Sequence, residues 1–110
     1  MKPLVLISAW LSLFVAGVAF AATIPGQPDP VHGKVLAESL CSNCHLVGSS
    51  QEHVNADVPS FREIANVPGR TAGDIIGFII LPKHPMPEIP LTKAELADLA
   101  AYIISLRDQP

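Results

Sequence analysis

The chain has 110 residues, of which 49% are hydrophobic and 15% are charged, and this length fits one small domain. Ten acidic residues outnumber seven basic ones, so the formal net charge is −3 at pH 7. An acidic balance of this kind argues against nucleic acid or an anionic membrane surface as a partner.

The first residues have the features of a targeting segment. Lys2 gives a positive start, residues 4–22 are almost entirely apolar, and residues 19–21 (Ala-Phe-Ala) match the small-residue pattern of a cleavage site. We therefore expect residues 1–21 to be a signal peptide and residues 22–110 to form the mature domain, which in a bacterium would lie in the periplasm. An uncleaved anchor facing the periplasm stays open, because about 18 apolar residues approach the length of a bilayer span.

Four helices are predicted in the remaining chain, and each has a capping signal at its start. Asp29 followed by Pro30 is typical of an N-cap and a first helical position, and it predicts a helix over residues 31–40. Three further positions are followed three residues later by Glu or Asp, as in a capping box: Ser60, Thr71 and Thr92. The helices that these boxes predict cover residues 61–65, 72–80 and 93–107.

Apolar side chains predict how these helices pack. The stripe of the first helix consists of Val35, Leu36 and Leu40. Gly33 either permits close approach of another helix or is simply exposed. Residues 75–80 form an apolar run that could be a buried strand, and the capping box before it favours a helix. The stripe of the last helix consists of Leu96, Leu99, Ala100, Ile103 and Leu106. Residues 81–90 contain four prolines and are expected to form a stiff extended loop.

The run Cys41-Ser42-Asn43-Cys44-His45 is the most specific feature, because Cys-x-x-Cys-His is the attachment signature of c-type haem. Residues three apart on a helical turn lie on one face, so both thiols can form thioethers with one porphyrin while His45 offers a nitrogen to the iron. The alternatives are a redox dithiol, half of a zinc site and a simple disulfide. The histidine directly after Cys44 favours one covalently attached haem c over all three.

The second axial ligand of the iron is expected in the proline-rich loop. Met86 lies there between two prolines, and it is the only methionine that remains once a leader is removed. A rigid loop can hold a thioether against iron with little conformational entropy to lose. We therefore expect His45 and Met86 to be the metal ligands. His84 is the competing ligand, since two residues apart on an extended loop both side chains would share one side. His32 and His53 are expected to be solvated surface residues.

These residues together resemble the class I cytochromes c, most closely the short bacterial periplasmic members with one haem. The resemblance covers the mature chain and includes the cysteine motif, the Met86 loop and the last helix with Tyr102. It implies an all-α fold in which helices surround one covalently bound haem and the first and last helices cross. It also implies that the Pro59 carbonyl accepts a hydrogen bond from His45 and that Tyr102 packs near the crossing.

One departure from the family concerns the haem propionates. The mature chain has no tryptophan to bind a propionate, because Trp10 lies in the leader. The basic residues that could take over this role are Arg62, Arg70 and Lys83.

The expected function is one-electron transfer rather than enzymatic catalysis. Two axial ligands from the protein would leave no open position on the iron for a substrate. We expect a monomeric shuttle between a dehydrogenase or reductase and a terminal oxidase or reductase, with transient redox partners and with membrane contact only through an uncleaved N-terminal segment. Two alternatives stay open: a haem subunit of a larger dehydrogenase complex and, if Met86 dissociates easily, a haem sensor or peroxidase.

Overall fold

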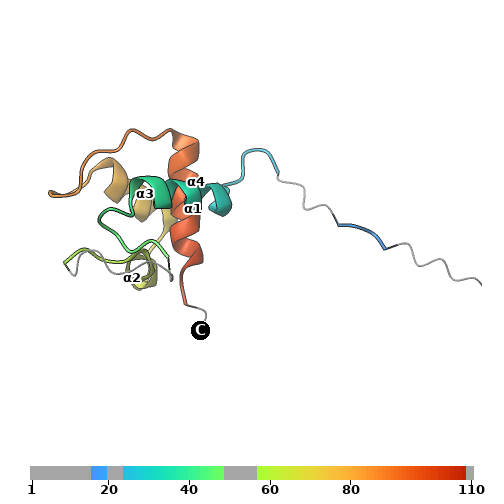
Figure 1. Ribbon diagram of the computed structural model, residues 1–110, viewed down its shortest axis with the longest axis horizontal. Coiled ribbons are helices and arrows are strands. Elements are labelled where there is room, and N and C mark those ends of the chain that lie inside the picture. The colour runs from blue at the N-terminus through green and yellow to red at the C-terminus, as the bar shows by residue number, and fades with distance from the viewer. Residues whose placement is uncertain (1–15, 20–23, 49–56, 109–110) are drawn as a thin grey trace, which may run out of the picture.

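The computed structural model describes residues 16–19, 24–48 and 57–108, and within these ranges it contains four α-helices and no strand (Figure 1). The helices are α1 (Pro30–Leu40), α2 (Phe61–Asn66), α3 (Ala72–Ile80) and α4 (Lys93–Ser105). The predicted all-α fold class is therefore confirmed, and residues 75–80 belong to a helix rather than a strand.

The predicted signal peptide, residues 1–21, lies outside the described residues except for 16–19. Its boundary with the mature domain therefore stays a prediction. His53 also lies outside the described residues. Within the ranges that the structure describes, no helix has both the length and the apolar character needed to cross a membrane.

The helices begin at the caps that the sequence predicts. The Asp29 side chain accepts hydrogen bonds from the backbone N–H groups of Val31 and His32, two of the donors that have no partner within α1. The other three helices each begin with a complete capping box, at Ser60, Thr71 and Thr92. Local hydrogen bonding thus decides where each helix starts.

Two helix ends differ slightly from the prediction. α2 continues through Asn66, one residue further than expected. α4 ends at Ser105 rather than Arg107, because the backbone N–H groups of Leu106 and Arg107 bond to carbonyls three residues back. Such bonds tighten the last turn and close the helix.

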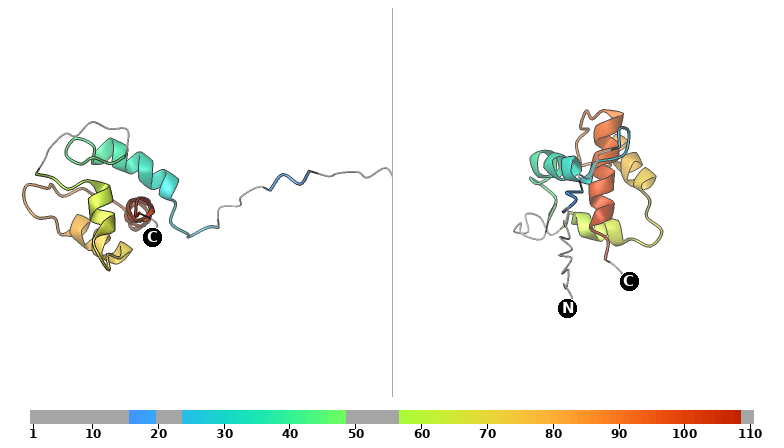
Figure 2. Two further views of the ribbon diagram at one scale, coloured as in Figure 1. Left: turned by 90° about the horizontal axis from the view of Figure 1, so that it is seen from below. Right: turned by 90° about the vertical axis from the view of Figure 1, so that its right-hand side faces the viewer.

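α1 and α4 cross, as the resemblance implied, and α2 and α3 also pack against α4 (Figures 1 and 2). The crossing is closest at Gly33. A Cβ atom at this position would lie 2.0 Å from the backbone oxygen of Asp98 and 2.9 Å from the Cβ of Tyr102. Of the two interpretations of Gly33, close approach of another helix is therefore the correct one.

The packing stripe predicted for α1 is only partly correct, because one of its three residues, Leu36, packs against the core. Val35 and Leu40 are exposed and Leu36 is only partly buried, whereas the buried residues of this helix are Gly33 and Ala37. The physical reason is the close crossing, which places small residues against α4 and turns the larger side chains aside. The stripe predicted for α4 is buried as expected, with Leu106 partly buried, and Tyr102 joins it.

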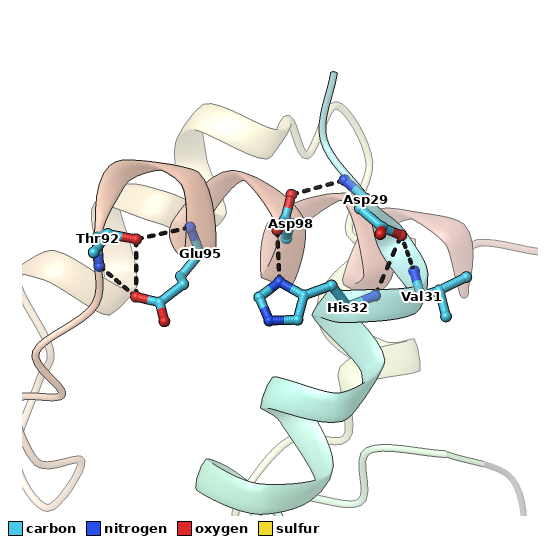
Figure 3. Close-up of polar contacts among 6 residues, drawn as sticks. All are labelled: Asp29, Val31, His32, Thr92, Glu95 and Asp98. Atoms are coloured by element: carbon cyan, nitrogen blue, oxygen red, sulfur yellow. Dashed lines mark hydrogen bonds and ion pairs between the residues drawn. The ribbon is translucent and has the colours of Figure 1, made fainter. Parts of the chain in front are cut away.

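Polar contacts join the start of α1 to the side of α4 (Figure 3). The Asp98 carboxylate accepts a hydrogen bond of 2.7 Å from the backbone N–H of Asp29 and lies 2.8 Å from Nδ1 of His32. We call Asp29, His32 and Asp98 the α1–α4 clasp. His32 is an exposed surface residue, as predicted, and it also contacts α4 through Asp98, which the sequence did not indicate.

The clasp changes the ionisation of the His32 and Asp98 side chains. The hydrogen bond to Asp98 raises the pKa of His32 above its usual value. Hydrogen bonds from the Asp29 backbone and from His32 lower the pKa of Asp98. Each shift favours the charged form, so the contact is an ion pair when His32 is protonated.

Candidate functional site

A large cavity lies between the helices and the loops. Its volume is about 860 Å³, near the upper end of the roughly 300–1,000 Å³ that is usual for small-molecule and cofactor sites. Side chains from all four helices line it, and most of the lining surface is apolar. The four residues predicted as cofactor-binding all line this cavity: Cys41, Cys44, His45 and Met86.

The cysteine motif begins at the end of α1. Cys41 is the C-cap of this helix, and its carbonyl accepts hydrogen bonds from the backbone N–H groups of Cys44 and His45, at 3.2 and 2.9 Å. This turn carries the chain back on itself, so the three side chains face one cavity. No disulfide joins Cys41 and Cys44. Among the described residues, no three or more His, Cys, Asp or Glu side chains are placed to hold a metal ion together.

The two cysteines differ in their surroundings. Cys41 is buried and Cys44 is exposed. Burial raises the pKa of the Cys41 thiol to about 11, because an apolar environment disfavours the thiolate. An uncharged sulfur, as a thiol or a thioether, therefore suits the wall of the cavity.

His45 is oriented by a backbone carbonyl. Its Nδ1 lies 2.7 Å from the carbonyl oxygen of Pro59, the partner that the resemblance implied. A carbonyl only accepts, so Nδ1 carries the proton and the lone pair of the neutral ring is on Nε2. This contact fixes the tautomer and makes the imidazole more electron-donating, as is usual for histidines that bind metals.

The short segment that carries Pro59 is held in place from both sides. The backbone N–H of Phe61 donates to the carbonyl of Leu46, at 3.0 Å, which ties the start of α2 to the residue after His45. The Phe61 and His45 rings also pack, with their centroids 5.3 Å apart. Further along the same loop, the Tyr102 hydroxyl donates to the carbonyl of Val47, at 2.6 Å. α2 and α4 thus together position the histidine.

The two candidate ligands in the proline-rich loop are placed differently. Met86 is half-buried and lines the cavity, whereas His84 is exposed and does not. The expectation that both share one side of an extended loop is wrong. The loop forms a turn in which the backbone N–H of Met86 donates to the carbonyl of Lys83, at 3.0 Å, and the alternation of an extended strand does not apply.

The three basic residues that could bind a haem propionate also differ in their positions. Arg70 and Lys83 line the cavity, and Arg62 does not; Arg62 instead pairs with Asp108. The Nε atom of Arg70 is buried and has no hydrogen-bond partner among the described residues. A buried donor of this kind requires an acceptor. An apolar cavity with two thiols, a fixed imidazole, a thioether and an unmatched guanidinium therefore fits haem c.

Sequence reasoning missed the contribution of α3 to this cavity. Ile75, Phe78 and Ile79 form part of the wall. The apolar run 75–80 has too few polar positions to reveal which side chains face a site, and only the packing of α3 on α4 decides it. The direction of Phe78, which is about half exposed, had no signal in the sequence.

One known protein is similar to this chain over most of its length. Cytochrome c-552 of Bradyrhizobium diazoefficiens is 39% identical over 93 residues, which make up 84% of this chain and 89% of the relative. No protein-family model matches the chain, and no solved structure matches it significantly. The identity extends over most of both chains, so the likeness is one of whole domains rather than of a short motif.

Proposed function

The chain belongs to the class I c-type cytochromes, which bind haem c covalently and take part in electron transfer, and on this basis we propose that it is a one-electron carrier with His45 and Met86 as axial ligands. Cys41 and Cys44 are the attachment residues in this proposal. The observation that carries it is the convergence of these four side chains on one cavity of suitable size. Haem c, when bound, supplies an iron that takes up and releases a single electron.

The residues around the cavity have separate tasks in this proposal. His45, with its proton held on Nδ1 by Pro59, presents Nε2 as a nitrogen ligand. Met86 presents a neutral thioether, and most of the wall around the cavity is apolar. An apolar site and a thioether both disfavour the more highly charged ferric state, so they raise the reduction potential.

A carrier fits this site better than an enzyme or a sensor. His45 and Met86 would occupy both axial positions and leave none for a substrate. A peroxidase or gas sensor would need a polar group near the open position of the iron, and the His84 side chain, which could supply one, does not line the cavity. No residue of the chain is assigned acid–base or nucleophilic work.

The compartment and the partners belong to the same proposal. Residues 1–21 act as a signal peptide that directs the domain to the periplasm. The domain works there as a monomer between a dehydrogenase or reductase and a terminal oxidase or reductase, through small and transient contacts. Purification of the native protein distinguishes this shuttle from a fixed subunit, which would elute with a larger flavin or quinone enzyme.

The ligand assignment is tested by absorption spectroscopy of two variants. Ferric iron bound by a thioether has a weak absorption band at the red end of the visible spectrum. We expect this band in the wild-type protein, its complete loss in Met86→Ala, and its retention in His84→Ala.

The two variants are matched, because they lie two residues apart on the same loop. Retention of the band in both variants would show that Met86 is not the ligand. Loss of the band in both would point to a general disturbance of the loop. If the wild-type protein, produced by cells that attach haem, has no mass beyond that of its polypeptide, the proposed function itself is wrong.

A further inference from the structure

Arg70 is a cationic side chain that faces the cavity without a matching acceptor. It lines the cavity, and its guanidinium carbon lies 4.8 Å from the centre of the Phe78 ring. Contact with an aromatic face stabilises a guanidinium and fixes its plane. Its Nε is buried, with no hydrogen-bond partner in the part of the chain that the structure describes. This donor therefore needs an acceptor that the described residues do not supply.

The backbone of Arg70 is held in place by a turn. Val67 to Arg70 form a β-turn in which the Arg70 N–H donates to the Val67 carbonyl, at 3.0 Å. Pro68 and Gly69 occupy its central positions, and Gly69 has a φ of 74°. This combination is typical of a type II turn, which requires a positive φ at its third residue.

A second arginine braces the same turn. The side chain of Arg107, just after α4, donates from Nε to the carbonyl of Ala65, at 2.9 Å, and from Nη2 to the carbonyl of Arg70, at 2.6 Å. Arg107 therefore ties the end of α2 and the turn to the end of α4. Arg70 reaches the cavity from a backbone that is fixed at both ends, and little entropy would be lost when it binds an anion.

The neighbouring charged groups do not satisfy Arg70. Asp74 is near enough for Arg70 to contribute to lowering the pKa of its carboxyl, but this carboxylate already accepts from the backbone N–H and the hydroxyl of Thr71. Asp57 also lines the cavity, and neither Asp57 nor Asp74 forms an ion pair with Arg70 among the described residues. Lys83 lines the cavity as well, but it belongs to the proline-rich loop and is exposed.

We propose that Arg70, stacked on Phe78 and braced by Arg107, binds a carboxylate group of the haem and raises the reduction potential of the iron. A guanidinium presents a planar set of donors that matches a carboxylate. Its positive charge disfavours the ferric state and holds the carboxylate ionised down to low pH. This proposal rests on the proposed haem-carrying function. Arg107 is a positioning residue, because it acts only through the backbone of Arg70.

The experiment is a redox titration of the haem-loaded protein between pH 5 and pH 8, with Arg70→Gln, Arg70→Lys, Lys83→Gln and Arg62→Gln. Arg62→Gln is the matched control, because it removes the same charge from a residue outside the cavity. For Arg70→Gln at pH 7, we expect a roughly tenfold fall in the reduction equilibrium constant, about 59 mV for a one-electron couple. The reduction potential of Arg70→Lys should lie between those of Arg70→Gln and the wild type.

The pH dependence gives a second readout. Without Arg70 the carboxylate has a higher pKa, so it ionises within the measured range. The potential of Arg70→Gln should therefore fall more steeply with rising pH than that of the wild type. A structural role of Arg70 alone would not create this additional slope.

Several outcomes would overturn the inference. Equal shifts of the reduction potential in Arg70→Gln and Arg62→Gln would show an effect of net charge only. A larger shift in Lys83→Gln than in Arg70→Gln would show that Lys83, and not Arg70, binds the carboxylate. If Arg70→Gln does not accumulate with haem, Arg70→Lys decides: a wild-type potential and slope in this variant would refute the role of the guanidinium. A wild-type protein that carries haem with a measurable potential leaves the proposed function standing in every one of these cases.

Discussion

The α1–α4 crossing and the loop side of the cavity solve different problems with different means. At the crossing, two helix backbones approach so closely that only a glycine fits at position 33, and the α1–α4 clasp joins the two helices beside it. On the loop side, short turns hold single side chains toward one space, as the Lys83–Met86 turn does for Met86. At the crossing, the size of a side chain therefore decides whether the two helices can pack. At the cavity, the chemistry and direction of a side chain decide whether it can contact a cofactor.

Substitutions at the crossing and substitutions at the cavity should therefore change different properties of the protein. A change at the crossing should lower the free energy of unfolding and leave the spectrum of a bound haem unchanged. A change of a ligand in the loop should alter the spectrum first, as Met86→Ala tests. Tyr102 is the point at which the regions meet, because it packs at the crossing and bonds to the loop that follows His45.

Gly33→Ala should have the largest effect on stability. The new Cβ would meet the backbone of Asp98 at 2.0 Å, and backbone cannot move aside as a flexible side chain can. We expect a loss of about 3 kcal/mol in the free energy of unfolding, at the upper end for overpacked sites, in denaturant titrations.

Gly77→Ala is the matched control for this change. Gly77 is also helical, in α3, and nothing lies within 4 Å of a Cβ placed there. This variant should be as stable as the wild type, or more stable by up to about 1 kcal/mol, because alanine favours helix over glycine. If both variants have the same stability, the crossing is not as close as described.

Tyr102→Phe should have an intermediate effect. The change removes the hydroxyl that donates to the buried carbonyl of Val47 and leaves the ring in place. We expect a loss of about 1 kcal/mol in chemical denaturation, because one buried hydrogen bond between α4 and the loop is removed.

The spectrum of the haem should change little in Tyr102→Phe, since His45 keeps its bond to Pro59. Ser105→Ala provides the control: it removes a hydroxyl on the same helix that donates to a carbonyl of its own turn, and it should change stability by less than about 0.5 kcal/mol. A Tyr102→Phe variant as stable as Ser105→Ala would contradict a linking role for Tyr102.

His32→Gln should have the smallest effect, and this effect should depend on pH. The pKa of His32 is raised, so its contribution is complete below the usual value of about 6.5 and is lost as the pH rises through the raised pKa. The pKa of Asp98 is lowered, so its contribution is present above the usual value of about 3.9 and is lost as the pH falls through the lowered pKa.

The stability difference between wild type and His32→Gln should therefore be largest between about pH 4 and pH 6.5 and should shrink toward pH 8. The negative charges of Asp29 and Glu95 also raise the pKa of His32, so they add to this stability difference. Lys34→Gln, on the exposed side of α1, should give a difference that does not vary between pH 5 and pH 8. A His32→Gln difference as large at pH 8 as at pH 5.5 would exclude the ion pair as its source.

Local signals in the sequence were sufficient for the helix starts and for the chemistry of the site. A cap needs only a side chain and the two or three backbone N–H groups that follow it, so Ser60, Thr71 and Thr92 could be identified without tertiary structure. The cysteine motif is likewise contained in five consecutive residues. Its resemblance to class I cytochromes c also led to Pro59 as the partner of His45, which the structure contains.

Features that depend on two distant segments could not be derived in this way. The packing face of α1 was only partly right, because a close crossing favours Gly33 and Ala37 over larger apolar residues, and hydrophobicity alone does not express that preference. The clasp was missed because His32 and Asp98 lie 66 residues apart. The different positions of Met86 and His84 could not be foreseen either: the turn of the loop places Met86 at the cavity and leaves His84 outside it, while the choice of Met86 as ligand stays a proposal.

The sequence by itself determined the helical class, the helix starts and the set of groups available to hold a cofactor, because each depends on neighbours along the chain. Only the tertiary structure decided which of these groups share a cavity, how closely α1 approaches α4, and which arginine is left with an unmatched donor. These features depend on distances between segments that are far apart in sequence, and such distances are set by packing.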